Sequence, residues 1–295
     1  ADRIRVGEAD VLIAGGAESM SLVPMGGNKP SFNAEIFAKD ENVGIAYGMG
    51  LTAEKVAQQW KVSREAQDAF ALESHLRAIK AQKAGEFSDE ITPVAVTERD
   101  IDLATADVTT RERTLSLDEG ARADTTLEGL AQLRPAFKAD GRVTAGNACP
   151  LNDGAAAVLV MSATRAEGLG LTPLARVVAS AVSGLDPRIM GVGPIEAVTK
   201  VLNRAGMKIG DIDVVELNEA FAAQVLPICD EVGISIEDQL NPHGGAIALG
   251  HPFGMTGARI MSTLINALEE TGGRYGLETM CVGGGQGMAM VIERL

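Results

Sequence analysis

The sequence predicts a layered α/β fold, and two observations support this class. Glycine is abundant, with 34 of 295 residues, whereas aromatic residues are few, with seven Phe, two Tyr and one Trp. Small and aliphatic side chains must therefore fill the core, and they favour close packing of helices on sheets. From Asp153 onward, short apolar strands alternate with helical patterns, which is typical of α/β layers. At 46% hydrophobic residues, the chain can bury a sizeable core in one large domain or about two.

The first residues have the pattern of a helix end followed by a buried strand. The segment ADRIRVG ends at Gly7, a frequent C-terminal cap, and the apolar run 9–14 leads into a Gly-Gly pair. A helix that consists only of its final turns has no nucleus of its own. We therefore expect either that this start is frayed or that the helix begins upstream of this sequence.

The stretch from Ser19 to about Asn152 is less regular. It contains a turn-rich segment, a helix with an acidic start near Glu54, and a longer helix from Ser63 to Ala84 with Ser63 as its N-cap. The charged, Thr-rich residues 97–126 predict surface loop with short strands. We expect this stretch to be an insertion that acts as a lid or substrate platform.

The remaining elements follow from apolar runs that end at glycines or polar caps. We expect strands at 155–161, 175–180, 214–216, 277–280 and 287–292, and helices at 194–205, 222–232 and 258–270.

One internal repeat connects the two ends of the chain. The segments VLIAGGAESM and TMCVGGGQGM each follow a helix that ends in glycine, and each reads as a strand that reaches a glycine loop. If the two halves share one plan, the first helix begins at its own glycine-rich loop before Ala1. A chance match between strands in a glycine-rich chain is the alternative.

Composition excludes several classes of function. A net charge of −14 argues against a nucleic-acid or anionic-membrane surface, and a polyanion can bind only at a local basic patch or at helix starts. No run of 18 apolar residues predicts a membrane span. Three cysteines without CxxC spacing predict neither disulfides nor a zinc site, and we expect no metal. We expect a soluble, cytoplasmic protein.

A histidine loop and a cysteine loop carry the candidate chemistry. His251 lies in GGAIALGHPFGMTGAR, where glycines allow a substrate close to the backbone, and Cys281 ends a strand before VGGGQG. We expect Cys281 to face a crevice at the carboxyl edge of the sheet, where a thiol near an imidazole exchanges protons. A structural loop histidine and an inert buried thiol are the alternatives.

Other polar residues are open to two interpretations. Asn218 is either a helix N-cap or an amide that holds a water or an oxyanion. His75 is expected to be a solvated surface residue, and His243 is either a supporting group or an ordinary loop residue. Cys229 is expected in the core. The GGGQG segment lacks the spacing and context of a dinucleotide-binding loop.

In their order and spacing, NEAFA, GGAIALGHPFGMTGAR and CVGGGQGMA resemble the thiolases, the acyl-CoA:acetyl-CoA C-acyltransferases, most of all the degradative 3-ketoacyl-CoA thiolases. Further agreement lies in AGGAESMS, GMGLTAE, LRPAF and TAGNACPLNDGAAA, so the likeness covers essentially the whole chain. It implies a five-layered αβαβα fold of two similar halves with an inserted loop domain. Residues 1–21 and 153–173 then belong to the N-terminal core half, 22–152 to the loop domain and 174–295 to the C-terminal core half.

The resemblance also implies roles for single residues. Cys281 matches the family's acid/base cysteine, His251 the histidine that activates the nucleophile and helps form an oxyanion hole, and Asn218 the asparagine that fixes the water of that hole. Further residues fall where family members line the tunnel for coenzyme A and the acyl chain, namely Met49, Arg122, Phe137, Ala145, Cys149, Met190 and Phe221.

Three departures from the family pattern matter. Cys149 replaces a serine that hydrogen-bonds the pantetheine arm in many relatives, and a thiol is a weaker partner. Gly48 stands where short-chain biosynthetic thiolases have a histidine, which favours longer or varied acyl chains. The nucleophilic cysteine is expected about ten residues upstream of Ala1, in a missing N-terminal segment, so the chain as written is expected not to form the acyl-enzyme.

The implied activity is thiolytic cleavage of a 3-ketoacyl-CoA by coenzyme A, or the reverse condensation, in fatty-acid β-oxidation. Coenzyme A is a substrate, and the family implies no cofactor; from charge and cysteine spacing we expect no nucleic-acid partner and no metal. A homodimer or homotetramer is expected, and a multienzyme β-oxidation partner is consistent with the family. The alternatives are a non-catalytic acyl-CoA-binding or interaction protein and a biosynthetic acetoacetyl-CoA thiolase.

Overall fold

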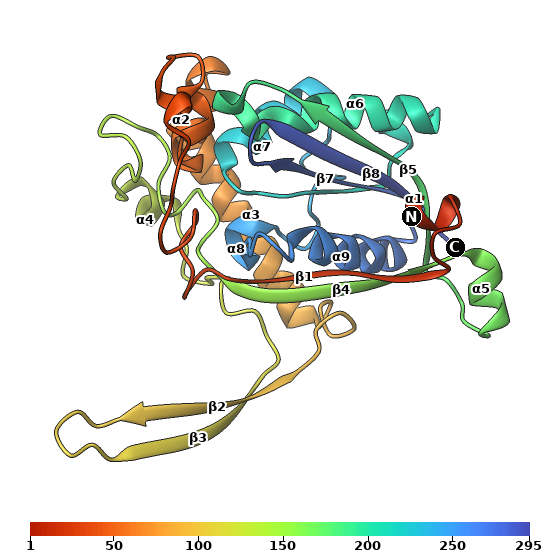
Figure 1. Ribbon diagram of the computed structural model, residues 1–295, viewed down its shortest axis with the longest axis horizontal. Helices are drawn as coiled ribbons and strands as arrows, with labels where there is room; N and C mark the ends of the chain where they lie inside the picture. Colours follow the sequence, from red (N-terminus) through yellow and green to blue (C-terminus); the bar gives the residue numbers. More distant parts are fainter.

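Two separate sheets with a helix between them form the body of the computed structural model, which describes residues 1–295. Helix α6 (Gly193–Ala205) covers the outer face of a four-stranded sheet, and α9 (Thr256–Thr271) lies between that sheet and a two-stranded ladder (Figure 1). The layers therefore follow one another as α, β, α, β.

The four-stranded sheet has the order β5-β8-β7-β6. Strands β5 (Ala175–Gly184), β8 (Gln286–Arg294) and β7 (Tyr275–Val282) are antiparallel neighbours, whereas β6 (Val214–Leu217) runs parallel to β7. Because the carboxyl ends of parallel strands meet at one edge, the residues that follow β6 lie beside the end of β7. This topology places the NEAFA segment next to Cys281.

The two-stranded ladder pairs β1 (Val11–Ser19) with β4 (Asp153–Met161) in antiparallel register. β1 does not end at Gly15 and Gly16 as expected but continues through them, because both glycines pair with residues of β4. Only glycine fits at position 15, where a Cβ would lie 2.8 Å from the Ala156 carbonyl oxygen. In the C-terminal copy of the repeat, the equivalent glycines form a turn between β7 and β8 instead.

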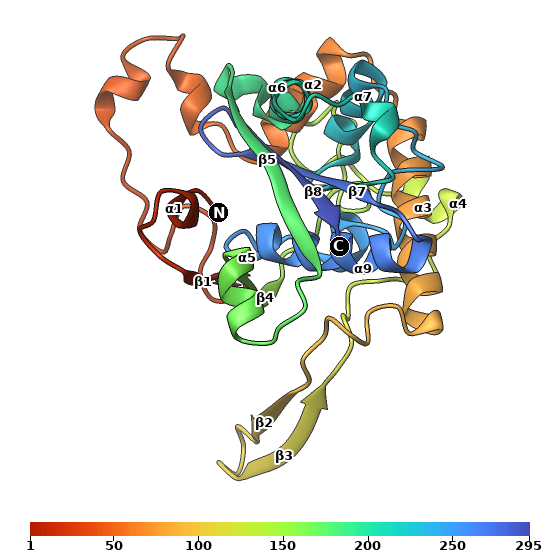
Figure 2. The same ribbon diagram turned by 90° about the vertical axis from the view of Figure 1, so that its right-hand side faces the viewer.

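The chain between β1 and β4 forms a side region built on two helices (Figure 2). α2 (Met49–Gln59) is followed by α3 (Arg64–Ala84), whose N-cap Ser63 accepts a hydrogen bond from the Ala66 amide. The expected loop with short strands is a projecting hairpin of two eight-residue strands, β2 (Val94–Ile101) and β3 (Val108–Leu115). The domain boundaries stay a prediction, which the two separate sheets support.

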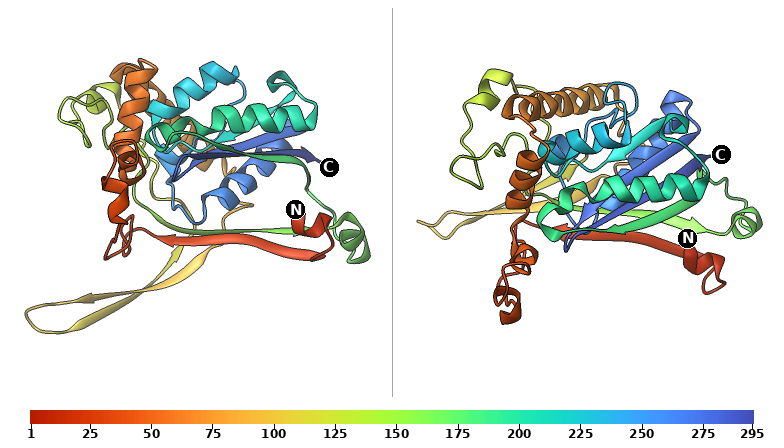
Figure 3. Two further views of the ribbon diagram at one scale, coloured as in Figure 1. Left: turned by 45° about the horizontal axis from the view of Figure 1, so that its top comes forward. Right: turned by 90° about the horizontal axis from the view of Figure 1, so that it is seen from above.

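Short elements complete the fold. α7 (Ala222–Val232) packs with α6 on the outer face of the sheet, and α8 (Ala246–Leu249) leads to the histidine loop. α1 (Asp2–Arg5) and α5 (Ala163–Gly168) lie at the end of the molecule where both termini are found (Figure 3). The others are α4 (Leu127–Ala131), η1 (Ala34–Phe37), η2 (Val43–Ala46), η3 (Pro187–Val192) and η4 (Ile209–Asp211). No helix has the length and apolar character needed to span a membrane.

Buried carboxyl groups mark the face of the sheet that α9 covers. Glu216 of β6 and Glu278 of β7 are paired neighbours in the sheet, and Arg259 of α9 approaches Glu216 with a 3.7 Å distance from Nη1 to Oε2. Burial raises the pKa of both Glu216 and Glu278 to about 8. Burial also raises the pKa of Glu90 to about 7, although Glu90 accepts a hydrogen bond from Thr263.

This arrangement makes stability depend on pH. The folded-state pKa values of the three carboxyls lie above the ordinary value of 4.5, so their stabilisation is complete below pH 4.5 and is lost as the pH rises through 7 to 8. We expect the free energy of unfolding in urea to fall by roughly 4–5 kcal/mol between pH 6.5 and 8.5. Glu278→Gln should reduce this fall, and Glu269→Gln, an exposed residue of α9, should not. A wild-type stability that stays constant or rises over this range contradicts the assignment.

Candidate active site

The histidine loop rests on the ladder through close backbone contacts. A Cβ at Gly16 of β1 would lie 1.7 Å from the carbonyl oxygen of Gly254, and one at Gly154 of β4 would lie 2.7 Å from the Met255 side chain. Glu18 accepts a hydrogen bond from the Gly254 amide at 3.1 Å. These contacts explain why glycine occupies positions 16 and 154, and they fix the position of the loop on the ladder.

His251 is held as a neutral base by its neighbours. Its Nδ1 lies 2.7 Å from Thr256 Oγ1, and that hydroxyl donates its single proton to the Pro252 carbonyl oxygen at 2.9 Å. The hydroxyl must therefore accept from Nδ1–H, which leaves the lone pair on Nε2. Burial, assisted by the positive charge of Arg259, lowers the pKa of His251 to about 4. The imidazole is thus uncharged at neutral pH and ready to accept a proton.

Cys281 lies at the end of β7 and is buried, not exposed to a crevice as the sequence predicted. The physical reason is the first turn of α7, where Gln224 covers the thiol and donates a hydrogen bond from Nε2 to Sγ at 3.2 Å. Burial raises the pKa of Cys281, and this hydrogen bond opposes the rise. The thiol is therefore protonated at neutral pH and can donate its proton.

Asn218 lies beside the last residues of β7, since its backbone amide donates to the Thr279 carbonyl oxygen at 3.1 Å. It is not a helix cap, because α7 begins four residues later with Phe221 in the N-cap position. Its side chain is fully buried, and neither Nδ2 nor Oδ1 has a hydrogen-bond partner. An unsatisfied buried amide costs about 1–3 kcal/mol, which native structures tolerate mainly where the group serves a function.

Glu219 connects this edge of the sheet to the histidine loop. Its buried carboxylate accepts hydrogen bonds from Ser74 Oγ of α3 at 2.6 Å, from Asn241 Nδ2 at 2.7 Å and from the Ile247 amide of α8 at 3.2 Å. Asn241 in addition exchanges two hydrogen bonds of 2.9 Å with the backbone of Leu217. The residues before His251 are therefore fixed relative to Asn218.

Cys149, which belongs to the segment TAGNACP, lies beside the NEAFA segment. Its backbone amide donates to the Ala220 carbonyl oxygen at 2.9 Å, and the preceding residue, Ala148, forms an antiparallel bridge with Phe221. Burial raises the pKa of Cys149 to about 12, and the nearby Cys281 contributes to the rise. The two thiols thus lie close to each other, and both are protonated.

Aromatic packing brings the expected acyl-tunnel residues together. The rings of Phe137 and Phe221 meet edge to face with centroids 6.0 Å apart. Phe137 also lies on Gly50, where a Cβ would come within 2.1 Å of the ring, and Met49 packs against the small core that contains Phe221. Met190, in contrast, is buried in η3, and its neighbour Gly191 packs against Gln224.

Arg122 and Ala145 line a cavity of about 1340 Å³ between the side region, β4 and α9. The cavity also contains Asn152, whose Oδ1 is buried without a partner. The expectation that His75 is a solvated residue is wrong, because α3 packs against α8 and buries this side chain. His75 Nδ1 accepts a hydrogen bond of 3.2 Å from the Arg122 amide and so fixes the cavity wall.

Sequence reasoning missed three residues that support the site, namely Thr256, Gln224 and Asn152. Their signals were present, since Thr256 begins the helix after the histidine loop, Gln224 lies in the first turn of the helix after NEAFA, and Asn152 lies in the motif NDG. The sequence does not show which residues they contact, because those residues are distant in the chain or their positions depend on the conformation of a loop. His251, Cys281 and Asn218 supply a neutral base, a protonated thiol and an unpartnered amide, respectively. This set of groups is suited to acyl transfer.

Comparison with known proteins identifies relatives along the whole chain. Residues 1–164 match the family model of the thiolase N-terminal domain, and residues 171–294 match that of the thiolase C-terminal domain. An acetyl-CoA acetyltransferase of Chromobacterium violaceum is 48% identical over all of this chain and 75% of its own length. A 3-ketoacyl-CoA thiolase of Bacillus subtilis is 46% identical over 99% of this chain and 74% of its own length.

Solved structures agree with this assignment. The Bacillus anthracis acetyl-CoA acetyltransferase has a TM-score of 0.85 and 40% identity, and it covers 99% of this chain and 74% of its own. The human mitochondrial 3-ketoacyl-CoA thiolase has a TM-score of 0.86 and 40% identity, and it covers all of this chain and 74% of its own. The α/β fold described above is therefore the fold of these structures, with about three-quarters of their length present.

The hydroxyl of Thr256 should determine the tautomer of His251. In Thr256→Val, Nδ1–H loses its acceptor in a buried site, so we expect about 1–2 kcal/mol less stability and a mixture of tautomers. Nitrogen-15 NMR of the imidazole measures the tautomer, and Thr256→Ser, which keeps the hydroxyl, is the matched control. A single Nδ1–H tautomer that persists in Thr256→Val would rule out this role.

Proposed function

The chain belongs to the thiolase family, and from this premise we propose that its residues form the acid/base machinery for cleavage of a 3-ketoacyl-CoA by coenzyme A. The products are acetyl-CoA and an acyl-CoA shortened by two carbons, and the reverse condensation uses the same groups. Three observations support this proposal most, namely the neutral imidazole of His251, the protonated thiol of Cys281 and the unpartnered buried amide of Asn218.

In the first half-reaction, His251 Nε2 accepts the proton of a cysteine thiol, and the thiolate attacks the keto carbon of the substrate. The bond between C2 and C3 breaks, and its electron pair remains on C2 as the enolate of acetyl-CoA. Cys281 gives its proton to C2. The unpartnered amide of Asn218 supports a role in stabilising the enolate oxygen through a bound water.

In the second half-reaction, the Cys281 thiolate removes the proton of coenzyme A. The coenzyme A thiolate attacks the enzyme thioester, and the nucleophilic cysteine leaves as a thiolate that recovers its proton from His251. Two acyl transfers thus replace one direct carbon–carbon cleavage. No cofactor takes part, because coenzyme A is itself the second substrate.

None of the three cysteines in residues 1–295 lies in a motif that matches the nucleophilic cysteine of the family. Cys229 is buried in the core of α7, and Cys149 and Cys281 both have raised pKa values, which oppose thiolate formation. We infer that none of these three cysteines forms the acyl-enzyme and that residues 1–295 alone do not turn over substrate.

The acyl chain is proposed to be longer than that of acetoacetyl-CoA. Gly48 lies directly before Met49 at the start of α2, with no atom within 4 Å of where its Cβ would be, so a larger side chain is absent where space is available. The neighbouring Phe137 and Phe221 supply an apolar wall. A biosynthetic acetoacetyl-CoA thiolase is the alternative, and equal or better kcat/KM for the short substrate supports it.

A second candidate function is binding of acyl-CoA without turnover, and the absence of a matching nucleophile favours it for residues 1–295 alone. Calorimetry then detects coenzyme A binding while no acetyl-CoA forms.

We further propose a reducing, cytoplasmic setting, consistent with three free cysteines, and a homodimer or homotetramer. The exposed apolar side chains Ile13 and Leu159 on the ladder support association through that face, with other chains of a β-oxidation assembly as alternative partners.

Thiolysis assays on two polypeptides test the proposed roles. Residues 1–295 alone should release no acetyl-CoA from acetoacetyl-CoA or a longer 3-ketoacyl-CoA. The same residues behind an N-terminal thiolase segment that carries its cysteine should be active, and His251→Asn or Cys281→Ser should lower kcat at least 100-fold there.

Cys229→Ala, which changes a core cysteine that takes no part in the proposed steps, serves as the control and should retain activity. A folded, extended protein with no thiolysis of either substrate contradicts the proposal. Full activity in Cys281→Ser would remove this residue from the mechanism.

A further inference from the structure

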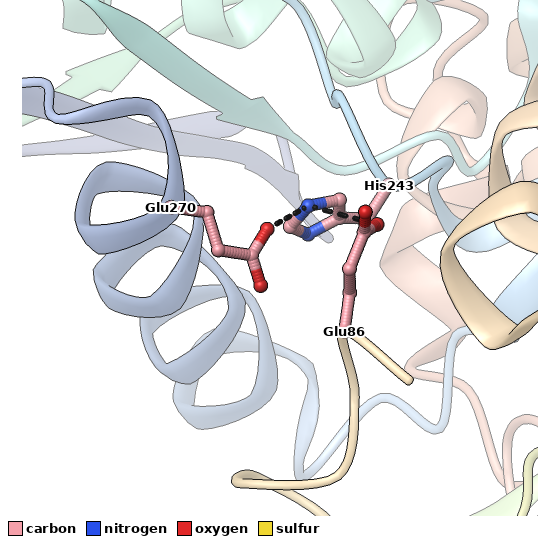
Figure 4. Close-up of side chains that lie close together, drawn as sticks. All are labelled: Glu86, His243 and Glu270. Atoms are coloured by element: carbon pink, nitrogen blue, oxygen red, sulfur yellow. Dashed lines mark ion pairs between the residues drawn. The ribbon is translucent and has the colours of Figure 1, made fainter. Parts of the chain in front are cut away.

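Three side chains with metal-ligand chemistry converge away from the residues of the proposed reaction (Figure 4). Glu86 follows directly after the C-terminal cap of α3, His243 belongs to the loop before α8, and Glu270 lies in the last turn of α9. The Nε2 atom of His243 is 2.7 Å from Glu270 Oε2 and 3.4 Å from Glu86 Oε2. One ligand atom from each residue lies within 4.8 Å of the other two.

The imidazole of His243 is oriented toward the two carboxylates. Its side chain is only 6% exposed, its ring packs edge to face with Phe87 at 5.9 Å between centroids, and its Nδ1 has no hydrogen-bond partner. All directed polar contacts of this buried ring are therefore made through Nε2, which points between Glu86 and Glu270 (Figure 4).

The charges of the cluster are not balanced by the protein. Neither Glu86 nor Glu270 forms an ion pair with a lysine or arginine, and His243 is the shared partner of both. A single Nε2–H bond can satisfy only one carboxylate well, which leaves two negative groups beside each other. A cation between the three residues would neutralise both carboxylates and use the imidazole lone pair.

The distances suit a small divalent ion. Ligand atoms about 2.0–2.2 Å from a tetrahedral metal are roughly 3.3–3.6 Å from one another. The 3.4 Å distance from Nε2 to Glu86 already matches, and the 2.7 Å distance to Glu270 requires a movement of less than about 1 Å. The side chains of Glu86 and Glu270 are 29% and 36% exposed, so an ion can enter from solvent and keep a water as its fourth ligand.

We propose that Glu86, His243 and Glu270 form a binding site for a divalent transition-metal ion, with zinc as the best-suited ion. The bound ion would connect the end of α3, the loop before α8 and the end of α9. Because α8 and the start of α9 flank the histidine loop, the ion would stabilise that loop from outside the proposed reaction centre. The three ligands are far apart in sequence, so no motif with metal-ligand spacing predicts the site.

Zinc titration of the untagged, chelator-treated protein tests this proposal. Calorimetry and equilibrium dialysis should show one zinc ion per chain, and zinc at 100 times Kd should raise Tm by about 5 °C. Magnesium at the same concentration should not give this shift, because it prefers six oxygen ligands. Cobalt should produce the visible absorption of a site with nitrogen and oxygen ligands.

Matched variants separate this site from general surface binding. His243→Ala and Glu270→Gln should each weaken zinc affinity at least 10-fold, and Glu269→Gln, with the same charge change one residue away on α9, should bind as the wild type does. If His243→Ala does not fold, Glu270→Gln decides the question, because its carboxylate is partly exposed. A wild-type Tm unaffected by zinc, or raised equally in Glu270→Gln, means that the cluster is only an ion pair and overturns the proposal.

Discussion

The buried carboxylate of Glu219 is the interaction on which the geometry of the site depends. It accepts hydrogen bonds from a helix of the side region, from the loop after Leu240 and from the first turn of α8, which are far apart in the chain. Burial raises its pKa, and these three hydrogen bonds oppose that rise. These hydrogen bonds bring three segments of the chain together at one buried side chain.

Close backbone contacts turn this connection into a defined shape. Gly244 and Gly245 allow the loop to approach α3 and Glu219, and Gly16 and Gly154 allow the histidine loop to lie on the ladder. Any Cβ at these four positions would fall within 3.0 Å of neighbouring atoms. Four of the glycines that first indicated close packing therefore lie where they help to position the proposed acid/base residues.

Much of the fold could be predicted because its signals are local. The α7 boundaries were predicted correctly, and α6 and α9 were correct to within two residues, since apolar periodicity and capping glycines operate over single turns. Errors arose where distant contacts decide the outcome. His75 is buried because α8 packs on its helix, and Cys281 is covered by Gln224 from another element. The lack of hydrogen-bond partners at the Asn218 side chain could not be predicted either, because an unsatisfied amide has no sequence signature.

Hydrogen exchange at the Ile247 amide tests the organising role of Glu219 most directly, because this amide donates to the carboxylate at 3.2 Å. In Glu219→Gln, which keeps the size of the side chain, the amide of Ile247 should exchange at least 10-fold faster than in the wild type, while amides of β8 stay protected. Unchanged protection of Ile247 in a folded Glu219→Gln variant would contradict the account and show that the loop is held by other contacts.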